Sequence, residues 1–377
     1  MILKTTDFQN VCKSIVLAVD SSFAANLELV TKDSTLYLNV TNREYYASVK
    51  FPIESTEEFR AVVDASLFLN LISGITTEDF ELDKKDNSVV VKAGKSNYKL
   101  AMIYENSELM TLPVISIENK TVTMPVSLDI LRSVLNVNSK ELTKIKNSKN
   151  VDIAEIQKLY YFTNEGCFTF TTGATLNRFT LDSPIKVLLN DRIVKLFKLF
   201  KEDVTFSLGH DTLPNGVVQT KICFETDNTY LAAIVTNDEV LLNQIQGPCT
   251  ATKRFIEEKY DNSVVLSTKA LSAALSRLML FTKNSVDSAN MRMILANVEI
   301  TNNDFTITDK LGNSETIAVE NGSYVDADYS MPLNIADLKL VLDSCEEDHI
   351  TLNCGNMRSI VISRGNISNL IPEGKRD

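Results

Sequence analysis

Side chains that commonly act in catalysis or bind metals are few in this chain, and they do not cluster in its sequence as the groups of an active site or metal site would. Its 377 residues include only two histidines, His210 and His349. His349 ends the run Cys345-Glu346-Glu347-Asp348-His349, which brings a thiol, carboxylates and an imidazole close together in sequence. No second cysteine or histidine nearby completes the ligand set that zinc usually takes. We therefore interpret this run as an acidic turn after a helix, and His210, in Gly-His-Asp-Thr, as part of another turn.

The sequence lacks the familiar catalytic motifs. It contains no G-x-x-x-x-G-K-[ST], no G-x-G-x-x-G and no G-x-S-x-G. A Cys–His nucleophile pair has no support beyond the proximity of Cys345 and His349. The carboxylate pairs Glu57-Glu58, Glu257-Glu258 and Glu346-Glu347 are typical of solvated helix ends or loops, with acid–base catalysis as the lesser alternative. We expect a protein that is not an enzyme and that uses no metal and no cofactor.

Cations gathered on one face of a short helix are the strongest candidate for binding chemistry. In Asn190–Lys201, residues wound at about 100° each place four apolar side chains within an arc of roughly 100° and four cations on the opposite half. The apolar set is Ile193, Leu196, Phe197 and Phe200, and the cationic set is Arg192, Lys195, Lys198 and Lys201. Asn190 suits the N-cap and Asp191 the positive end of the helix. The basic face is either an ordinary solvated surface or an anion-binding surface.

The composition is that of a soluble globular protein, with 44% hydrophobic and 23% charged residues. The net charge is −11, but it divides into −5 for residues 1–120, +1 for 121–255 and −7 for 256–377. The middle third therefore carries the basic character. Six cysteines without a C-x-x-C pair are typical of reduced thiols in the cytosol. With no signal pattern and no apolar run of membrane-spanning length, we expect a cytoplasmic protein that avoids membranes.

The elements that would position these residues recur three times along the chain. Each copy has the order helix, strands, helix, strands over about 120 residues. The first helices have expected caps at Thr6, Ser127 and Ser267 or Thr268, and the second helices at Asp64, Asn190 and Asn334. The pattern predicts an α+β fold of three domains, 1–120, 121–255 and 256–377. Strands at the ends of each copy are expected to pair with the next copy, which would protect their edges.

Three stretches carry a resemblance to a known family. They are Val63–Phe68 with Gly94-Lys95-Ser96-Asn97-Tyr98-Lys99-Leu100, then Thr171-Thr172-Gly173-Ala174-Thr175-Leu176-Asn177-Arg178-Phe179, and Leu370-Ile371-Pro372. Together with the three repeats, they resemble the bacterial DNA polymerase III β subunit, the sliding clamp, over the whole length. Leu176 and Asn177 depart from the family's Gly-His, and five residues follow Pro372. Such divergence is typical of a phage or other divergent replication system.

The resemblance implies a ring made by a head-to-tail homodimer, with helices lining a central hole and sheets outside. Such a ring encircles double-stranded DNA without reading its sequence, and it tethers DNA polymerase after a clamp loader has placed it. Tyr98 and Leu100 match one side of the family's dimer interface, and Leu280 and Phe281 match the other. From the sequence alone, these four residues fit local cores equally well.

Two sets of site residues follow from the resemblance. Cations on the inner helices would attract phosphates: Arg192, Lys195, Lys198 and Lys201, then Arg132, Lys269, Arg277 and Lys339, with Lys13 weaker and Lys140–Lys149 in a loop. An apolar pocket would bind short peptides of polymerase, clamp loader and repair factors. Its matching positions are Ala174, Arg178, Phe179, Val240, Ile245, Leu370, Ile371 and Pro372. Val240 replaces the family's proline, and the expected loop Thr236–Ile245 lacks the family's basic-aromatic pattern. The peptide consensus is therefore expected to differ from that of cellular clamps.

One alternative keeps the fold and changes the function. A scaffold or oligomeric structural protein that does not bind DNA could be built on the same three repeats. Reversing the charges of the Asn190–Lys201 helix distinguishes the two hypotheses, because only a clamp would then lose its hold on DNA.

Overall fold

The computed structural model describes residues 1–20, 25–55, 57–136, 155–170, 173–213, 216–236, 239–282, 294–301, 304–355 and 357–374. The chain forms two compact units, Met1–Arg132 with Arg192–Asn237, and Ser133–Asp191 with Asp238–Asp377. The middle third of the sequence thus contributes to both. The expected division into three domains stays a prediction.

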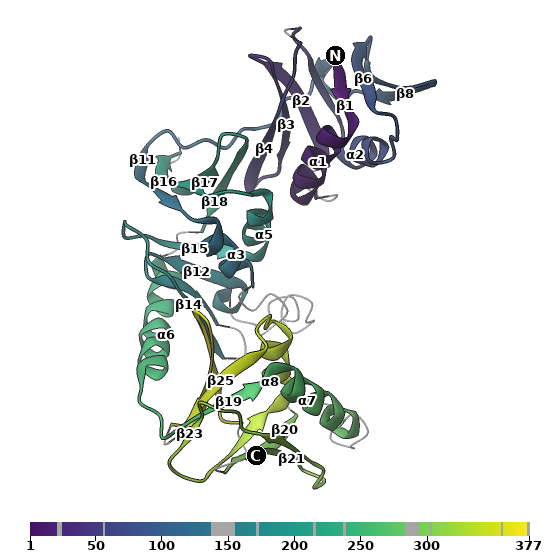
Figure 1. The fold of residues 1–377 in the computed structure, drawn as a ribbon. Coiled ribbons are helices and arrows are strands. Elements are labelled where there is room, and N and C mark those ends of the chain that lie inside the picture. Colours follow the sequence, from purple (N-terminus) through teal and green to yellow (C-terminus); the bar gives the residue numbers. More distant parts are fainter. Residues whose placement is uncertain are drawn as a thin grey trace. The chain divides into compact units, whose positions relative to one another are not determined.

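The first unit is built on an antiparallel sheet of eight strands, with helices packed on it (Figure 1). Its strands, in spatial order, are β11 (Lys120–Val126), β16 (Val204–Thr212), β17 (Val218–Glu225), β18 (Thr229–Val235), β4 (Tyr45–Pro52), β3 (Thr35–Thr41), β2 (Asn26–Lys32) and β5 (Arg60–Asp64). A second sheet runs β1 (Ile2–Lys4), β6 (Asp79–Lys85), β7 (Ser88–Ala93) and β8 (Ser96–Ala101), and β9 (Tyr104–Glu105) pairs with β10 (Glu108–Leu109). The helices are α1 (Thr5–Ile15), η1 (Val16–Ala18) and α2 (Ala65–Ser73), followed later by α5 (Asp191–Lys195) and η3 (Leu196–Leu199).

The second unit is built on an antiparallel sheet of nine strands. Its order is β15 (Lys186–Asn190), β12 (Leu159–Thr163), β13 (Gly166–Thr169), β14 (Ala174–Arg178), β27 (Ile367–Pro372), β26 (Ser359–Arg364), β25 (His349–Cys354), β19 (Asn262–Ser267) and β23 (Tyr324–Val325). A smaller sheet runs β22 (Ser314–Ala318), β21 (Asp304–Asp309), β20 (Leu295–Ile300) and β24 (Tyr329–Asn334). Helix α6 (Glu239–Glu257) lies on one face of the large sheet, and α7 (Thr268–Thr282) with α8 (Ile335–Asp343) on the other (Figure 1). A short helix, η2 (Glu155–Lys158), precedes β12.

Strands from successive repeats pair with each other, as expected from the sequence. In the first unit β4 pairs with β18, with Tyr45 opposite Ala233. In the second unit β14 pairs with β27, with Ala174 opposite Leu370. Each pairing covers an edge that would otherwise expose free backbone N–H and C=O groups. Strands that the expected division assigns to different copies therefore pair at both places, but β4 and β14 lie in the middle of their copies and not at the ends as expected.

Local capping signals place several helices correctly. The predicted caps accept backbone hydrogen bonds as follows: Asp64 from Leu67 N at 2.7 Å, Ser127 from Ile130 N at 3.4 Å, Ser267 from Ala270 N at 3.3 Å, and Asn334 from Ala336 N at 3.2 Å. Helix α1 differs, because it begins at Thr5 after Lys4, whose side chain makes no capping bond. On α2 the buried positions are Ala65, Phe68, Leu69 and Ile72, whereas Leu67 is 58% exposed.

The basic helix is shorter than the sequence predicts. Helix α5 (Asp191–Lys195) gives way at Leu196 to the 3₁₀ turn η3. Besides the four expected apolar residues, Val194 and Leu199 are buried, so the apolar face is wider than a regular helix would allow. Phe197 packs edge-on to Phe224 of β17, with ring centroids 4.8 Å apart. This packing holds the segment to the sheet, while Lys195, Lys198 and Lys201 stay exposed.

Two sequence interpretations are wrong. The expected loop Thr236–Ile245 is largely the beginning of α6, whose Ile245, Cys249 and Thr252 recur at helical spacing and are buried. Pro248 lies inside this helix, where it removes a backbone hydrogen bond. His210 lies in strand β16 and not in a turn. Its neighbour Gly209 allows a close approach of backbone, since a Cβ there would lie 2.3 Å from the carbonyl oxygen of Asn119.

Candidate functional site

The exposed lysines of the α5–η3 segment form the clearest basic surface of the first unit. Lys195, Lys198 and Lys201 are exposed, and the apolar side chains between them are buried, whereas Glu202, next to Lys201, is exposed. The Nζ of Lys201 donates to the backbone oxygen of Lys198 at 3.4 Å, which leaves its charge facing solvent. Lys198 and Lys201 form no ion pair within the described part of the chain. Lys13, in the last turn of α1, is also exposed.

The fourth cation of this segment is bound within the protein. The guanidinium of Arg192 lies 2.6 Å from a carboxylate oxygen of Asp20 and 3.8 Å from one of Glu44. Its side chain is 34% exposed and the side chain of Asp20 is 20% exposed. Arg192 therefore meets any external anion in competition with two carboxylates of its own chain.

The remaining predicted cations are mostly paired as well. Arg277 on α7 donates through Nε and Nη2 to the two carboxylate oxygens of Glu315 on β22, at 2.7 and 2.6 Å. These hydrogen bonds lower the pKa of Glu315 and raise that of Arg277. Lys339 pairs with Asp343 one turn further along α8, and Arg132 lies 3.8 Å from Asp129 on α3 (Leu128–Asn136). Lys269, at the start of α7, is exposed and makes no ion pair with described residues. The segment Lys140–Lys149 lies outside the described residues.

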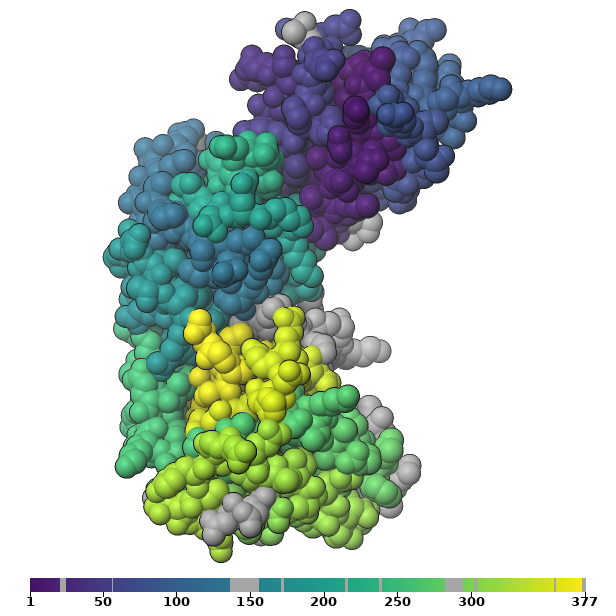
Figure 2. Space-filling model, viewed as in Figure 1, coloured from purple at the N-terminus to yellow at the C-terminus, as the bar shows by residue number. Residues whose placement is uncertain are grey.

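Three of the predicted pocket residues meet on the α6 face of the second unit. Ala174 of β14, Ile245 of α6 and Leu370 of β27 belong to one apolar cluster, with Phe168 and Tyr161 among its buried members. Ala174 is 9% exposed and Ile245 is 1% exposed. The side chain of Ile245 thus lies within the cluster and does not border an open groove. Figure 2 shows the outer side of α6, in green, exposed along the molecular surface.

The other predicted pocket residues are distributed by strand alternation. Phe179 packs at a tilt against Phe162, with ring centroids 5.3 Å apart, on the sheet face opposite α6. Ile371 belongs to the core beneath α7 and α8. Arg178 is exposed and pairs with Glu257 at the end of α6, 3.1 Å away. Val240, 63% exposed, and Pro372 remain at the surface. Thr171 and Thr172, from the motif that suggested this pocket, lie outside the described residues.

The four predicted interface residues differ in exposure. Tyr98 on β8 is 42% exposed, and Leu280 and Phe281 near the end of α7 are 61% and 51% exposed. Leu100 is 3% exposed and belongs to the core of the first unit. Strand β8 is the last strand of its sheet, and β22 is the last strand of the small sheet in the second unit. Among the described residues no further strand pairs with β8 or β22, so each leaves one backbone edge without a strand partner.

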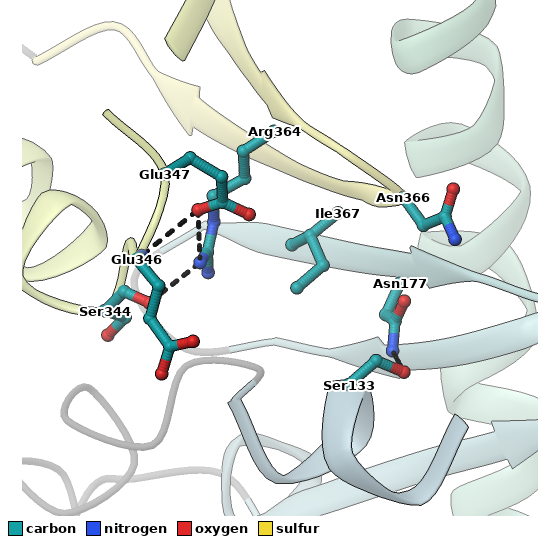
Figure 3. Close-up of a pocket in the computed structure, with 8 residues that line it drawn as sticks. All are labelled: Ser133, Asn177, Ser344, Glu346, Glu347, Arg364, Asn366 and Ile367. Carbon is teal, nitrogen blue, oxygen red and sulfur yellow. Dashed lines mark hydrogen bonds and ion pairs between the residues drawn. The ribbon is translucent and has the colours of Figure 1, made fainter. Parts of the chain in front are cut away.

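Sequence reasoning missed one polar cavity in the second unit (Figure 3). It has a volume of about 190 Å³ and is lined by Ser133, Asn177, Ser344, Glu346, Glu347, Arg364, Asn366 and Ile367. Arg364, 4% exposed, donates through Nη1 to the carbonyl oxygen of Ser344 at 2.8 Å and lies 3.7 Å from Glu347. Its Nε and Nη2 are shut off from solvent and have no partner among the described residues. The arrangement joins the end of α8 to β26, and an arginine in a strand gives no sequence signal for it.

Reactive groups are held in inert states. Burial raises the pKa of the Cys12, Cys249 and Cys354 thiols to about 12, so they stay protonated at neutral pH and are poor nucleophiles. The Cys345–Asp348 run is the predicted acidic turn between α8 and β25. His349 Nε2 lies 2.8 Å from a carboxylate oxygen of Glu320. Over the residues described, no three His, Cys, Asp or Glu side chains gather as metal ligands would. None of the described helices is both long and apolar enough to span a membrane.

Comparison with known proteins places this fold. No protein-family model matches the chain. The β sliding clamp of Helicobacter pylori strain J99 is 22% identical over 215 residues, which cover 53% of this chain and 56% of that protein. The match thus spans little more than half of the relative's length.

Solved structures match over nearly the whole length. The DNA polymerase III β subunit of Thermotoga maritima has a TM-score of 0.75 at 15% identity, and a sliding clamp of Pseudomonas aeruginosa bound to griselimycin has 0.78 at 13%. The Helicobacter pylori β clamp bound to a DNA ligase peptide has 0.70 at 15%. Each comparison covers 100% of this chain and 99% of the other. The chain has the fold of bacterial sliding clamps, and the resemblance expected from the sequence is confirmed for the fold.

Proposed function

We propose that this protein is a DNA sliding clamp that encircles duplex DNA and tethers the replicative polymerase. The observation that carries the proposal is the clamp fold over the full chain, joined by sequence similarity to a β sliding clamp. A clamp acts by topology and not by bond chemistry, which agrees with a chain whose buried thiols are protonated. The protein would work in the cytoplasm, where the DNA is replicated.

Sliding requires attraction to the phosphate backbone that is weak and independent of sequence. The exposed Lys195, Lys198 and Lys201 supply such attraction from the first unit, and Lys269 from the second. The net charge of −11 opposes binding elsewhere on the surface. We assign these lysines the larger share of DNA contact, and the paired Arg132, Arg192, Arg277 and Lys339 a smaller one.

A ring needs two such chains joined head to tail, each with three domains at 1–120, 121–255 and 256–377. Both strands required for that joint are last in their sheets, β8 with the exposed Tyr98 in the first unit and β22 in the second. Edge strands of two chains can join their sheets through backbone hydrogen bonds. Leu280 and Phe281, exposed on α7, would be covered by the partner. A contact between different patches closes into a ring when the rotation allows it.

Partner proteins would bind at the surface where α6 meets β14 and β27. A related clamp binds a DNA ligase peptide. In this chain the apolar centre of that surface, including Ile245, is already packed by α6. Peptides of polymerase and clamp loader would therefore contact the exposed margin, with Val240, Arg178 and Pro372 as the matching residues.

The test combines retention on DNA with polymerase extension. The protein is loaded on nicked circular DNA with its cognate loader, and the half-life of the complex is measured before and after the circle is linearised. The triple variant Lys195→Glu, Lys198→Glu and Lys201→Glu should lower the amount of protein loaded on the circle at least tenfold and reduce the length of polymerase products. Lys84→Glu, Lys85→Glu and Lys95→Glu, an equal change of charge at exposed lysines of the β6–β8 sheet, should leave both unchanged. A wild-type protein that is monomeric at micromolar concentration and leaves extension unaffected would refute the proposal.

A further inference from the structure

Several of the basic side chains expected to contact DNA form ion pairs with carboxylates of the same chain. Arg277 is held by Glu315, Arg192 by Asp20, and Lys339 by Asp343. The pairs occur in both units and involve residues from different elements in two of the three cases. They recur at the predicted DNA-contacting positions, whereas Lys198, Lys201 and Lys269 have no such partner in the described part of the chain.

The carboxylate of Glu315 binds Arg277 in the same geometry that a phosphate group would use. Two parallel N–H···O bonds of 2.7 and 2.6 Å use the same guanidinium edge that binds two phosphate oxygens. Arg277 is 56% exposed, so a phosphate could reach it, while Glu315 on β22 is 23% exposed. An arginine in this fork can serve either the carboxylate or a phosphate, because each needs the same two donors.

The pair between Arg192 and Asp20 repeats the arrangement beside the exposed lysines. Asp20 follows η1, and Arg192 lies in α5 with Lys195, just before the turn η3 that carries Lys198. The 2.6 Å ion pair, with Glu44 at 3.8 Å, places two negative charges next to the strongest basic surface of the first unit. Exposed ion pairs contribute little to folding stability. Their effect on an approaching anion is more direct, since each carboxylate both occupies a cation and repels phosphate.

We propose that Glu315 and Asp20 are intramolecular competitors of the DNA phosphate backbone and limit how tightly this clamp holds DNA. The inference rests on the proposed function and adds residues that regulate the same surface. A phosphate that binds Arg277 or Arg192 must displace a carboxylate that is held close by the fold. The free energy needed to displace the carboxylate lowers the affinity of the protein for DNA, and this weaker attraction allows the ring to move along the duplex. The lysines supply the attraction, and the paired arginines contribute only when the carboxylates are displaced.

The test is the affinity of the full-length protein for a short linear duplex, measured by fluorescence anisotropy from 25 to 200 mM salt. Glu315→Gln and Asp20→Asn should each tighten binding about fivefold at the lowest salt. Each should also steepen the slope of log K against log salt by about 0.9, the value for one further phosphate contact. Glu81→Gln removes the carboxylate of a comparable exposed pair with Lys92, at 2.9 Å in the β6–β7 hairpin, and should change neither quantity. Sedimentation of every variant shows whether its oligomeric state is that of wild type.

A second comparison tests whether the tighter DNA binding of Glu315→Gln depends on Arg277. The double variant Arg277→Gln and Glu315→Gln should lose the increase in DNA affinity that Glu315→Gln shows alone. Arg277→Gln alone should weaken DNA binding less than twofold relative to wild type. Unchanged or weaker binding by both carboxylate variants, in a protein that the lysine reversals still impair, would overturn the competition and leave the clamp proposal standing. An equal gain for Glu81→Gln would also overturn it, because net charge alone would then explain the change. Insensitivity to the lysine reversals would refute the proposed DNA surface itself.

Discussion

The pKa of Glu315 depends on its neighbour Arg277. Two hydrogen bonds from Arg277 stabilise its charged form and so lower its pKa from the ordinary value of 4.5. When a carboxyl pKa is lower in the folded than in the unfolded state, the unfolded state binds protons more readily as pH falls. The stabilisation is therefore present above the unfolded-state pKa and is lost as pH falls through the folded-state pKa.

This linkage predicts a pH-dependent difference between wild type and Glu315→Gln. Wild type should melt at a slightly higher temperature than Glu315→Gln, by an amount that is constant from pH 8 to about 5. This difference in melting temperature should disappear as pH falls below about 4.5. Melting curves of the two proteins at matched ionic strength measure it. Glu258→Gln, which removes an exposed carboxyl that forms no ion pair with a described residue, is the matched control for the loss of one surface carboxyl. A difference for Glu315→Gln that widens in acid would contradict the assigned direction of the pKa shift.

Helix α6 is attached to its sheet mainly by a small apolar cluster. Ile245 is the most buried residue of α6, at 1% exposure, while Pro248 interrupts the backbone hydrogen bonds three residues later. Ile245→Ala should therefore cost about 2–5 kcal/mol, the range for a large core side chain reduced to alanine. Denaturant unfolding and amide hydrogen exchange of α6 measure the loss. Val240→Ala, on the same helix at 63% exposure, should change stability by less than about 0.5 kcal/mol. Equal effects of the two changes would show that α6 is not held through Ile245.

The elements differ in how well the sequence predicts them, and the reason is the range of the interaction. Asp64 and Asn334 cap helices through bonds to residues two or three positions away, so their signals are local and the helices were predicted correctly. The burial of Ile245 depends on strand residues such as Leu188, Tyr161 and Leu370, which lie 57, 84 and 125 positions away from it in sequence, and the sequence pattern does not predict its helix. Pairing of β14 with β27 was foreseen only in outline, from the repeats and the need to protect strand edges.

The candidate site was predicted less completely than the fold. Spacing correctly placed Lys195, Lys198 and Lys201 on an exposed face. Spacing could not show that Arg277 reaches Glu315, because the two residues are 38 positions apart and meet only through the packing of α7 on β22. Resemblance grouped Phe179 and Ile371 with Ile245, but strand alternation places them on the other face of the sheet. Ion pairing and sheet faces are properties of the folded chain, which residue types alone do not specify.

At the scale of the whole molecule, the proposed ring depends on two surfaces that one chain cannot cover. The exposed Leu280 and Phe281 lie together near the end of α7, beside the edge strand β22 that contacts this helix. Exposed apolar side chains next to an open sheet edge favour association, because both the backbone groups and the apolar area gain from being covered. The partner's β8, with Tyr98, presents an open edge of its own.

The double variant Leu280→Asp and Phe281→Asp should convert the proposed dimer into a monomer. Two buried carboxylates at the joint would lack partners, and the cost of desolvating them should raise the dissociation constant at least a hundredfold. Sedimentation velocity from 0.1 to 50 μM protein measures the change. Tyr324→Asp, at a 56% exposed position on β23, should stay dimeric. Both monomeric variant and wild type should bind a short duplex alike, since the lysines are intact, but only wild type should remain on a closed circle. A double variant that is still dimeric would place the joint elsewhere, and a monomer retained on circles would remove the need for a ring.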